Sequence, residues 1–240
     1  MFKSKRILAF IPARAGSKGI KNKNIVDFAG KPLIHWTIQS SRDSKYIDRT
    51  VVSTDGVEIA NIAKQSGADV PFLRPAELAT DQSSMGEPLK HCVEWLGKNE
   101  KDFYDYLMVL QPTSPLRTTQ HINQAIEFYF ENRKTENDTL ISVTLAPRKA
   151  AYIMEKAKKG YINFCFDITI DKRRRQNLPQ YYWPNGMFFL APIAIAKKDG
   201  FYSKHTLPFV MEDDVSVDID SMEDLQKALE VFGAQSVPIK

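Results

Sequence analysis

The stretch Ile7-Leu-Ala-Phe-Ile11, followed by Pro12-Ala-Arg-Ala-Gly-Ser-Lys-Gly-Ile-Lys-Asn-Lys-Asn24, decides the fold of this 240-residue chain. A short apolar run ended by a proline is typical of a strand that is buried on both faces of a parallel sheet. A loop rich in glycine and cations begins directly after the run. Together they predict an α/β protein with a polar loop at the carboxyl end of its first strand.

Strands and helices alternate outward from this stretch. Apolar runs predict further strands over 49–54, 106–110 and 140–145, and helical spacing predicts helices over 32–40, 57–65, 89–96 and 122–129. The alternation predicts a right-handed, doubly wound, mostly parallel (Rossmann-like) α/β sheet. Ligands of such sheets bind beyond the carboxyl ends of the strands, so we expect the site in the loops after Ile11, Ser53 and Leu110.

The alternation of strands and helices stops between residues 146 and 182. Alternation over Tyr161, Asn163 and Cys165 indicates an antiparallel strand pair there instead of another βα unit. We therefore interpret 146–182 as a small inserted lobe, with 1–145 and 183–240 forming the core. A strand over 185–190 and a last helix behind a Ser221–Asp224 capping pair complete that core.

Composition argues against two classes of partner. The hydrophobic fraction of 43% suffices for one core, and the formal charge of +4 is small for a nucleic-acid-binding protein, despite the basic tract 172–175. The chain has no apolar run long enough to span a membrane, and its N-terminal apolar stretch is too short for a signal peptide. Cys92 and Cys165, far apart in apolar stretches, are interpreted as buried free thiols, so we expect a cytoplasmic protein.

The loop after the first strand has the composition of a phosphate site. Gly16 and Gly19 let backbone amides approach a phosphate, and Ser17 adds a hydroxyl donor. Three cations supply the positive charge that a triphosphate needs, namely Arg14, Lys18 and Lys23. The spacing is neither that of a GxxxxGK[ST] loop nor that of a G-x-G-x-x-G fingerprint. The alternative, a solvated basic loop, is disfavoured by its position behind a buried strand.

Acidic residues gather at the other end of the chain, over 212–224. Asp218 and Asp220 lie two residues apart, so in an extended chain both carboxylates can reach one divalent cation. Hard oxygen ligands and a phosphorylated substrate favour Mg²⁺. A surface strand end with exposed acids is the alternative. If the fold joins the two ends of the chain, a cationic pocket lies beside an anionic one, as a phosphate ester held with a metal requires.

A second polar loop, Gln111-Pro-Thr-Ser-Pro-Leu-Arg117, follows the strand predicted over 106–110. Two prolines stiffen it, which leaves Gln111, Thr113, Ser114 and Arg117 as polar groups for a hydroxylated or charged ligand. The alternative is a rigid turn with an exposed arginine.

With these motifs the chain resembles the CMP-sialic acid synthetase family, the N-acylneuraminate cytidylyltransferases. The resemblance runs through most of the chain and rests on Ile11–Gly19, Gly30–Pro32, Val52–Asp55, Arg74-Pro75, Gln111–Arg117, Asn185-Gly186 and Asp218–Asp220. It implies a nucleotidyltransferase-type fold, a homodimer whose dimerisation lobe is 146–182, and Mg²⁺ as cofactor. It also implies transfer of CMP from CTP to the anomeric hydroxyl of a nine-carbon sialic-acid-type sugar, with release of pyrophosphate, as activated sugar for surface glycans.

The resemblance further implies roles for individual residues. Catalysis would depend on Lys18, Arg14, Asp218 and Asp220, the last two as metal ligands. The nucleotide would be held by Arg14, Ala15, Gly16, Ser17, Lys18, Lys23, Asn24, Arg74, and Ser83 or Ser84. The sugar would contact Gln111, the acyl-pocket walls Phe188 and Phe189, and two cations from the lobe of a second subunit, Lys149 and Arg175.

Alternatives remain for the substrate and for activity itself. N-Acetylneuraminate and legionaminate are equally expected, and pseudaminate shares their nine-carbon frame. Cytidylyltransferases for Kdo usually continue their first loop with Ser-Thr-Arg-Leu-Pro-Gly-Lys, from which Ser17–Asn24 departs. A catalytically idle sugar-nucleotide-binding protein on the same fold is the rival class.

Overall fold

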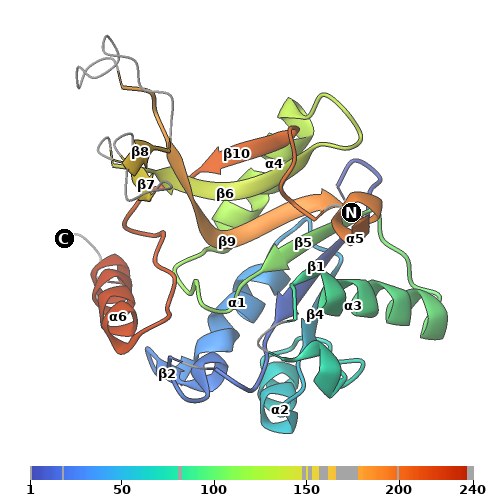
Figure 1. Ribbon diagram of the computed structural model, residues 1–240. Helices are drawn as coiled ribbons and strands as arrows, with labels where there is room; N and C mark the ends of the chain where they lie inside the picture. Colours follow the sequence, from blue (N-terminus) through green and yellow to red (C-terminus); the bar gives the residue numbers. More distant parts are fainter. Residues whose placement is uncertain are drawn as a thin grey trace.

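The computed structural model describes residues 2–17, 19–80, 83–147, 150, 153–156, 162–165, 178–198 and 200–236. A six-stranded sheet forms its centre, in the order β10-β6-β9-β5-β1-β4 (Figure 1). The strands are β1 (Ile7–Pro12), β4 (Arg49–Ser53), β5 (Tyr106–Leu110), β6 (Thr139–Leu145), β9 (Tyr182–Pro192) and β10 (Thr206–Val210). The strands predicted over 7–11, 49–54, 106–110 and 140–145 thus agree with β1, β4, β5 and β6 to within one residue at each end.

The sheet is mostly parallel, which confirms the predicted fold class. β1 pairs in parallel with β4 on one side and β5 on the other, and β10 pairs in parallel with β6. β9 runs antiparallel between β5 and β6, a direction that the sequence did not predict. Because the chain adds β4 on one side of β1 and then crosses to add β5, the sheet changes its direction of growth beside β1. Ligands of α/β sheets bind at such a switch point.

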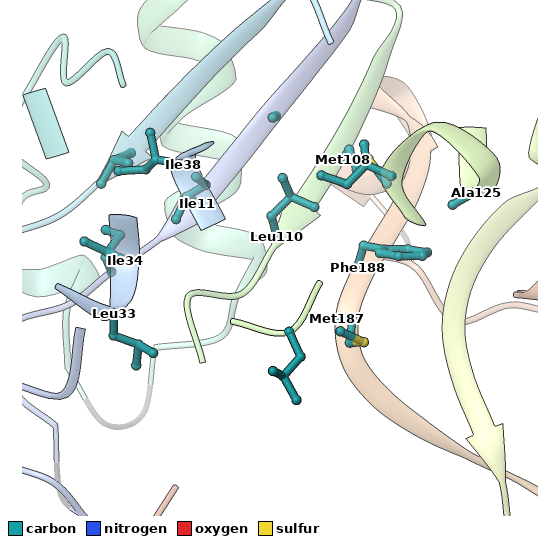
Figure 2. Close-up of a cluster of buried hydrophobic side chains, with 14 of the residues drawn as sticks. Ile11, Leu33, Ile34, Ile38, Met108, Leu110, Ala125, Met187 and Phe188 are labelled. Carbon is teal, nitrogen blue, oxygen red and sulfur yellow. The ribbon is translucent and has the colours of Figure 1, made fainter. Parts of the chain in front are cut away.

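Helices cover both faces of the sheet. Alternate residues of β1 point to opposite faces: Ile7, Ala9 and Ile11 join one core, whereas Leu8 and Phe10 join the other. The first core is closed by α1 (Leu33–Arg42), α2 (Val57–Gln65), α4 (Thr119–Asn132) and α6 (Met222–Ser236), and the second by α3 (Gly86–Asn99) and α5 (Ile193–Lys198). Figure 2 shows the first core, where side chains of α1 lie against the sheet.

The predicted antiparallel strand pair within 146–182 is present. β7 (Met154–Lys156) pairs antiparallel with β8 (Ile162–Phe164), and the pair stands beyond the carboxyl end of β6 (Figure 1). Other short elements are β2 (Asp27–Phe28), β3 (Lys31–Pro32) and the 3₁₀ turns η1 (Lys23–Ile25) and η2 (Ala76–Leu78). The sequence did not predict α5 or β10.

Helix α6 begins at the predicted capping pair. The Ser221 hydroxyl accepts a hydrogen bond from the backbone N–H of Asp224, whose carboxylate accepts from the N–H groups of Asp220 and Ser221. Both cysteines are free, as predicted, but only Cys92 is buried, whereas Cys165 is exposed. Among the described residues, no helix combines the length and the apolarity that crossing a membrane requires.

Candidate active site

A cleft of about 380 Å³ opens at the carboxyl ends of β1 and β5, at the switch point of the sheet. Its walls come from three separate parts of the chain, the loop 12–24, the loop after β5, and the segment 218–220. The lining residues are Pro12, Arg14, Ser17, Gly19, Lys23, Asn24, Gln111, Pro112, Thr113, Asp218 and Asp220. The cationic and anionic ends of the chain therefore meet in one cleft.

Gly19 and Lys23 make the contact between the two ends. A Cβ atom added to Gly19 would lie 2.2 Å from the backbone oxygen of Asp220, so only glycine allows this approach. The Nζ atom of Lys23 lies 2.7 Å from Oδ1 of Asp220. This geometry meets the central condition of the sequence prediction, that the basic loop and the acidic segment share one site.

The acidic segment is held so that both carboxylates face the cleft. Val217 and Ile219 are buried, and the Ile219 N–H donates to the backbone oxygen of Thr113 at 2.8 Å. Since neighbouring residues of an extended chain point in opposite directions, Asp218 and Asp220 face outward. Although the Asp218 side chain is accessible to solvent, the surrounding walls desolvate it and raise the pKa of its carboxyl, and the nearby Asp220 raises it further.

The loop after β1 is shaped by its own hydrogen bonds. The Asn24 side-chain amide donates to the backbone oxygen of Arg14 at 2.8 Å, which folds the end of the loop back on its beginning. The Ala15 N–H donates to Oδ1 of Asp55 at 2.9 Å, so that amide is already engaged within the protein. The open space beside Gly16 leaves its backbone accessible. Lys18 lies outside the described residues.

A second cavity, of about 360 Å³, adjoins the cleft and shares Pro12 and Arg14 with it. It is lined further by the predicted cytidine-pocket residues Arg74, Ser83 and Ser84, and by Leu78, Ala79, Thr80, Met85 and Pro88. The Arg74 guanidinium is buried and donates to the side-chain and backbone oxygens of Ser53 at the end of β4. Burial lowers the pKa of Arg74, as does the neighbouring charge of Arg14, whereas Asp55 opposes the shift.

A third cavity, of about 410 Å³, adjoins the cleft on the opposite side and shares Gln111 and Asp218 with it. Its other walls are Thr144, Trp183, Pro184, Asn185, Gly186, Phe189, Tyr202 and Ser216. Gly186 has a φ of +71°, and a Cβ atom there would lie 2.6 Å from Oε1 of Gln111. Glycine therefore lets β9 pass directly beside the Gln111 carboxamide.

The structure separates the two phenylalanines predicted as walls of an acyl pocket. Phe189 lines the third cavity, next to Tyr202. Phe188 points to the opposite face of β9, is fully buried, and packs against Phe209, so the structure contradicts its place in the pocket wall. Adjacent residues of a strand face opposite sides of the sheet, so only one of the pair can line the cavity. The predicted sugar contacts Lys149 and Arg175 lie outside the described residues.

The loop after β5 divides its polar residues between the cleft and the interior. Gln111 and Thr113 line the cleft, as expected. Ser114 and Arg117 are buried instead, so neither the predicted ligand contact nor the alternative of an exposed arginine describes them. The sequence did not predict Trp183 and Tyr202 as cavity walls, because the two segments that contain them carry no recognised motif.

The fold and the cleft together define an α/β protein of the nucleotidyltransferase type. Two solved structures share the fold. CMP:2-keto-3-deoxy-manno-octonic acid synthetase complexed with CTP has a TM-score of 0.70 and 14% identity, over 96% of this chain and 99% of that chain. The 4-diphosphocytidyl-2C-methyl-D-erythritol synthase of Anaerococcus prevotii has a TM-score of 0.64 and 12% identity, over 95% and 99%. At such identities the likeness is one of fold.

The family model described as cytidylyltransferase matches residues 8–235, and the chain belongs to that family. Its relatives include an N-acylneuraminate cytidylyltransferase of Escherichia coli (34% identical, 94% of this chain), a pseudaminic acid cytidylyltransferase of Campylobacter jejuni (32%, 92%) and a CMP-N,N'-diacetyllegionaminic acid synthase of Legionella pneumophila (36%, 90%). The chain spans about half the length of the E. coli relative (52%), and 94% and 91% of the other two.

Proposed function

We propose that this chain transfers CMP from CTP to the anomeric hydroxyl of a nine-carbon sialic-acid-type sugar and releases pyrophosphate. One observation carries the proposal. A cleft with Arg14 and Lys23 on one wall and Asp218 and Asp220 on another lies between two further cavities. The order suits a nucleotide base, a triphosphate with its metal, and a sugar, and the curated relatives are named for this chemistry.

The cavity around Arg74 is the proposed cytidine pocket. It joins the cleft at Arg14, where the α-phosphate of a bound nucleotide would emerge. Ser83 and Ser84 supply hydroxyls to this pocket, although the Ser83 hydroxyl also lies 2.8 Å from that of Thr80. Beyond Arg14, the open backbone at Gly16 and the Ser17 hydroxyl provide donors for phosphate oxygens. The assignment of Lys18 to the phosphates rests on the sequence resemblance.

We propose that Asp218 and Asp220 hold Mg²⁺. The described residues contain no cluster of three or more potential metal-binding side chains, so the remaining ligands would be phosphate oxygens and water. This donor set fits Mg²⁺, which is commonly held by one or two carboxylates together with substrate phosphates. When bound, Mg²⁺ neutralises charge on the triphosphate and makes its α-phosphorus more electrophilic.

In the proposed reaction the anomeric hydroxyl oxygen of the sugar attacks the α-phosphorus of CTP. A new P–O bond forms, the bond between the α-phosphorus and the bridging oxygen breaks, and pyrophosphate leaves with the electron pair. Arg14 and Lys23 stabilise the negative charge that develops on the phosphates. The hydroxyl proton passes to a carboxylate of the cleft, Asp218 or Asp220.

The third cavity is the proposed sugar pocket. The Gln111 carboxamide offers hydrogen bonds to hydroxyl groups, and the aromatic walls Phe189, Trp183 and Tyr202 offer an apolar surface to an acyl group. N-Acetylneuraminate and legionaminate remain the favoured substrates, with pseudaminate as the alternative that a relative's name supports.

Pyrophosphate release should be measured with CTP, Mg²⁺ and a panel of acids comprising N-acetylneuraminate, di-N-acetyllegionaminate, pseudaminate and Kdo, with UTP and ATP as competing nucleotides. We expect release that requires both CTP and a nine-carbon acid, and a CMP-sugar of the corresponding mass. CTP binding without release for any acid would instead support the idle sugar-nucleotide-binding protein. Release with Kdo alone would refute the nine-carbon assignment.

We also propose a cytoplasmic homodimer whose interface includes the lobe 146–182. Supporting this, large apolar side chains are exposed where the lobe joins the sheet, at Leu145, Ile153, Met154 and Tyr182. In such a dimer Lys149 and Arg175 would reach the partner's sugar pocket. Light scattering coupled to size-exclusion chromatography should give twice the mass of one chain, and Leu145→Asp should shift the protein toward monomer. A wild-type monomer at micromolar concentration would contradict the proposal.

A further inference from the structure

Arg117, at the end of the loop after β5, is almost completely buried, with 2% of its surface exposed. It lines none of the three cavities assigned to the substrates. Burying a guanidinium is costly, and hydrogen bonds from its Nη atoms offset part of that cost. Burial lowers the pKa of Arg117 to about 9, whereas the field of Asp218 opposes the shift. The side chain therefore needs an explanation other than direct contact with the proposed substrates.

The hydrogen bonds of Arg117 join three elements behind the proposed sugar pocket. Its Nη2 atom donates to the backbone oxygen of Gln111 at 3.0 Å and to the Thr37 hydroxyl of α1 at 2.7 Å. Its Nη1 atom donates to the backbone oxygen of Met187 in β9. The Thr37 hydroxyl in turn donates to the Gln111 oxygen at 3.4 Å, so that carbonyl has two donors.

One carbonyl belongs to Gln111, which lines the sugar pocket, and the other to Met187, which is buried and directly follows the lining residue Gly186 in the sequence. The Gln111 side chain lies in the cleft and in the sugar pocket, and a Cβ atom added to Gly186, next to Met187, would lie 2.6 Å from its Oε1 atom. The side chain of Asp218 lies within 3.6 Å of a Cβ atom built at Gly186. One rigid, planar cation thus fixes the spacing between the loop after β5 and β9, where Gln111, Gly186 and Asp218 converge.

We propose that Arg117 is a positioning residue that sets the distance between Gln111 and Gly186, and thereby the fit of the acceptor sugar. The inference rests on the proposed function for its substrate, but not for its geometry. The loop 12–24 and the cavity around Arg74 make no hydrogen bond to Arg117 among the described residues. Loss of Arg117 should therefore weaken sugar binding and spare CTP binding.

Arg117→Lys tests this, because lysine keeps the charge but cannot reach three acceptors in the geometry of a guanidinium. With the best acid of the panel, we expect KM for the sugar to rise by about tenfold, while KM for CTP stays within about twofold. Thr37→Val, a milder change that removes only the shared hydroxyl, should raise KM for the sugar by a smaller factor. A purely structural role would lower Tm and change both KM values together, or neither.

Arg133→Lys is the matched control. Arg133 also bonds β5, through the Tyr106 hydroxyl at the opposite end of the strand, and pairs with Glu136 at 3.1 Å. This variant should lower Tm and leave KM for the sugar unchanged.

Hydrogen–deuterium exchange provides a measurement that does not depend on turnover. In Arg117→Lys we expect faster exchange in peptides covering 111–117 and 185–190, with unchanged exchange in 12–17 and 19–24. If the wild-type protein uses no acid of the panel, the proposed function fails, and this exchange pattern alone decides the inference. Unchanged exchange at 111–117 and 185–190, or an equal rise in both KM values, would overturn it.

Discussion

Gly19→Ala is the most direct test of the contact between the two ends of the chain. The glycine has no positive φ that an alanine would strain, so the added methyl group acts through contact alone. That methyl carbon would lie 2.2 Å from the backbone oxygen of Asp220, and real contacts of this kind are not shorter than 3.0 Å. The loop and the acidic segment must therefore separate by at least the difference, 3.0 − 2.2 = 0.8 Å.

A displacement of this size is large for a catalytic site. A misplacement of about 1 Å can cost about 100-fold in rate, which corresponds to about 2.7 kcal/mol of transition-state stabilisation. Global stability should change little, because replacing glycine restricts the unfolded chain and contributes about 0.4–1 kcal/mol in favour of folding, which offsets part of the strain. We therefore expect kcat/KM to fall by about 100-fold, with Tm nearly unchanged.

Pyrophosphate release measures the effect, and Gly233→Ala is the comparison. A Cβ atom at Gly233, which lies in α6 and lines none of the three cavities, meets nothing within 4 Å, so kcat/KM of this variant should stay near that of the wild type. Thermal melts of both variants would show whether either one unfolds. If Gly19→Ala retained wild-type kcat/KM, the contact with Asp220 would have no bearing on the reaction, and a shared site for the two charged ends would lose its main support.

Three further predictions follow from the ion pairs. Asp220→Asn should lower metal-dependent turnover by about 100-fold or more. Tm should stay unchanged because the Asp220 side chain is 76% exposed, and turnover at the wild-type rate would refute its metal role. Lys23→Gln should tighten the binding of Mn²⁺ to the nucleotide-free protein by up to about fivefold, because the Lys23 ammonium no longer competes with the cation for Asp220. An electron paramagnetic resonance titration measures this affinity, and weaker binding would contradict the prediction. Arg49→Met should lower the free energy of unfolding, measured with denaturant, by about 1–2 kcal/mol, because Arg49 pairs with three carboxylates. It should leave kcat/KM unchanged, because Arg49 lies at the amino end of the sheet, far from the cleft. Burial opposes ionisation of Asp102, but hydrogen bonds from its tyrosine and arginine neighbours, Arg49 among them, outweigh it and lower the carboxyl pKa. This contribution to stability is present above the ordinary aspartate pKa of about 4 and is lost as pH falls through the lowered value, so Arg49→Met should flatten the acid limb of the stability curve.

The sequence predicted the elements whose signals are local. The apolar runs of β1 and β5, the helix over 57–65 and the cap of α6 could each be identified from a few neighbouring residues. The direction of β9 could not, because an apolar run has the same composition whichever way the strand is read. The sequence did not predict β10 because Pro208 and partly exposed side chains weaken its strand signal.

Site residues, too, could be predicted where the signal lies in neighbouring residues and not where it depends on distant parts of the chain. The acids of 218–220 and the loop 12–24 could be paired in advance because their charges are opposite and each follows an apolar segment. Arg117 could not be placed, because burial of an arginine depends on acceptors from β9 and α1 that are distant in sequence. Phe188 is a different case, because strand alternation alone could have assigned it to the opposite face from Phe189.

The direction of β9 has a consequence for how substrate preference could be changed. The walls that face the nucleotide are loops that follow the carboxyl ends of β1, β4 and β5. The sugar-pocket wall around Gly186 instead belongs to the first half of β9, which runs antiparallel to β5. Residues 182–186 therefore form one continuous segment of this wall, which pairs with β6 through Tyr182, Trp183 and Pro184. Exchanging this segment between relatives that prefer different acids should transfer the preference for the acceptor sugar and leave KM for CTP unchanged.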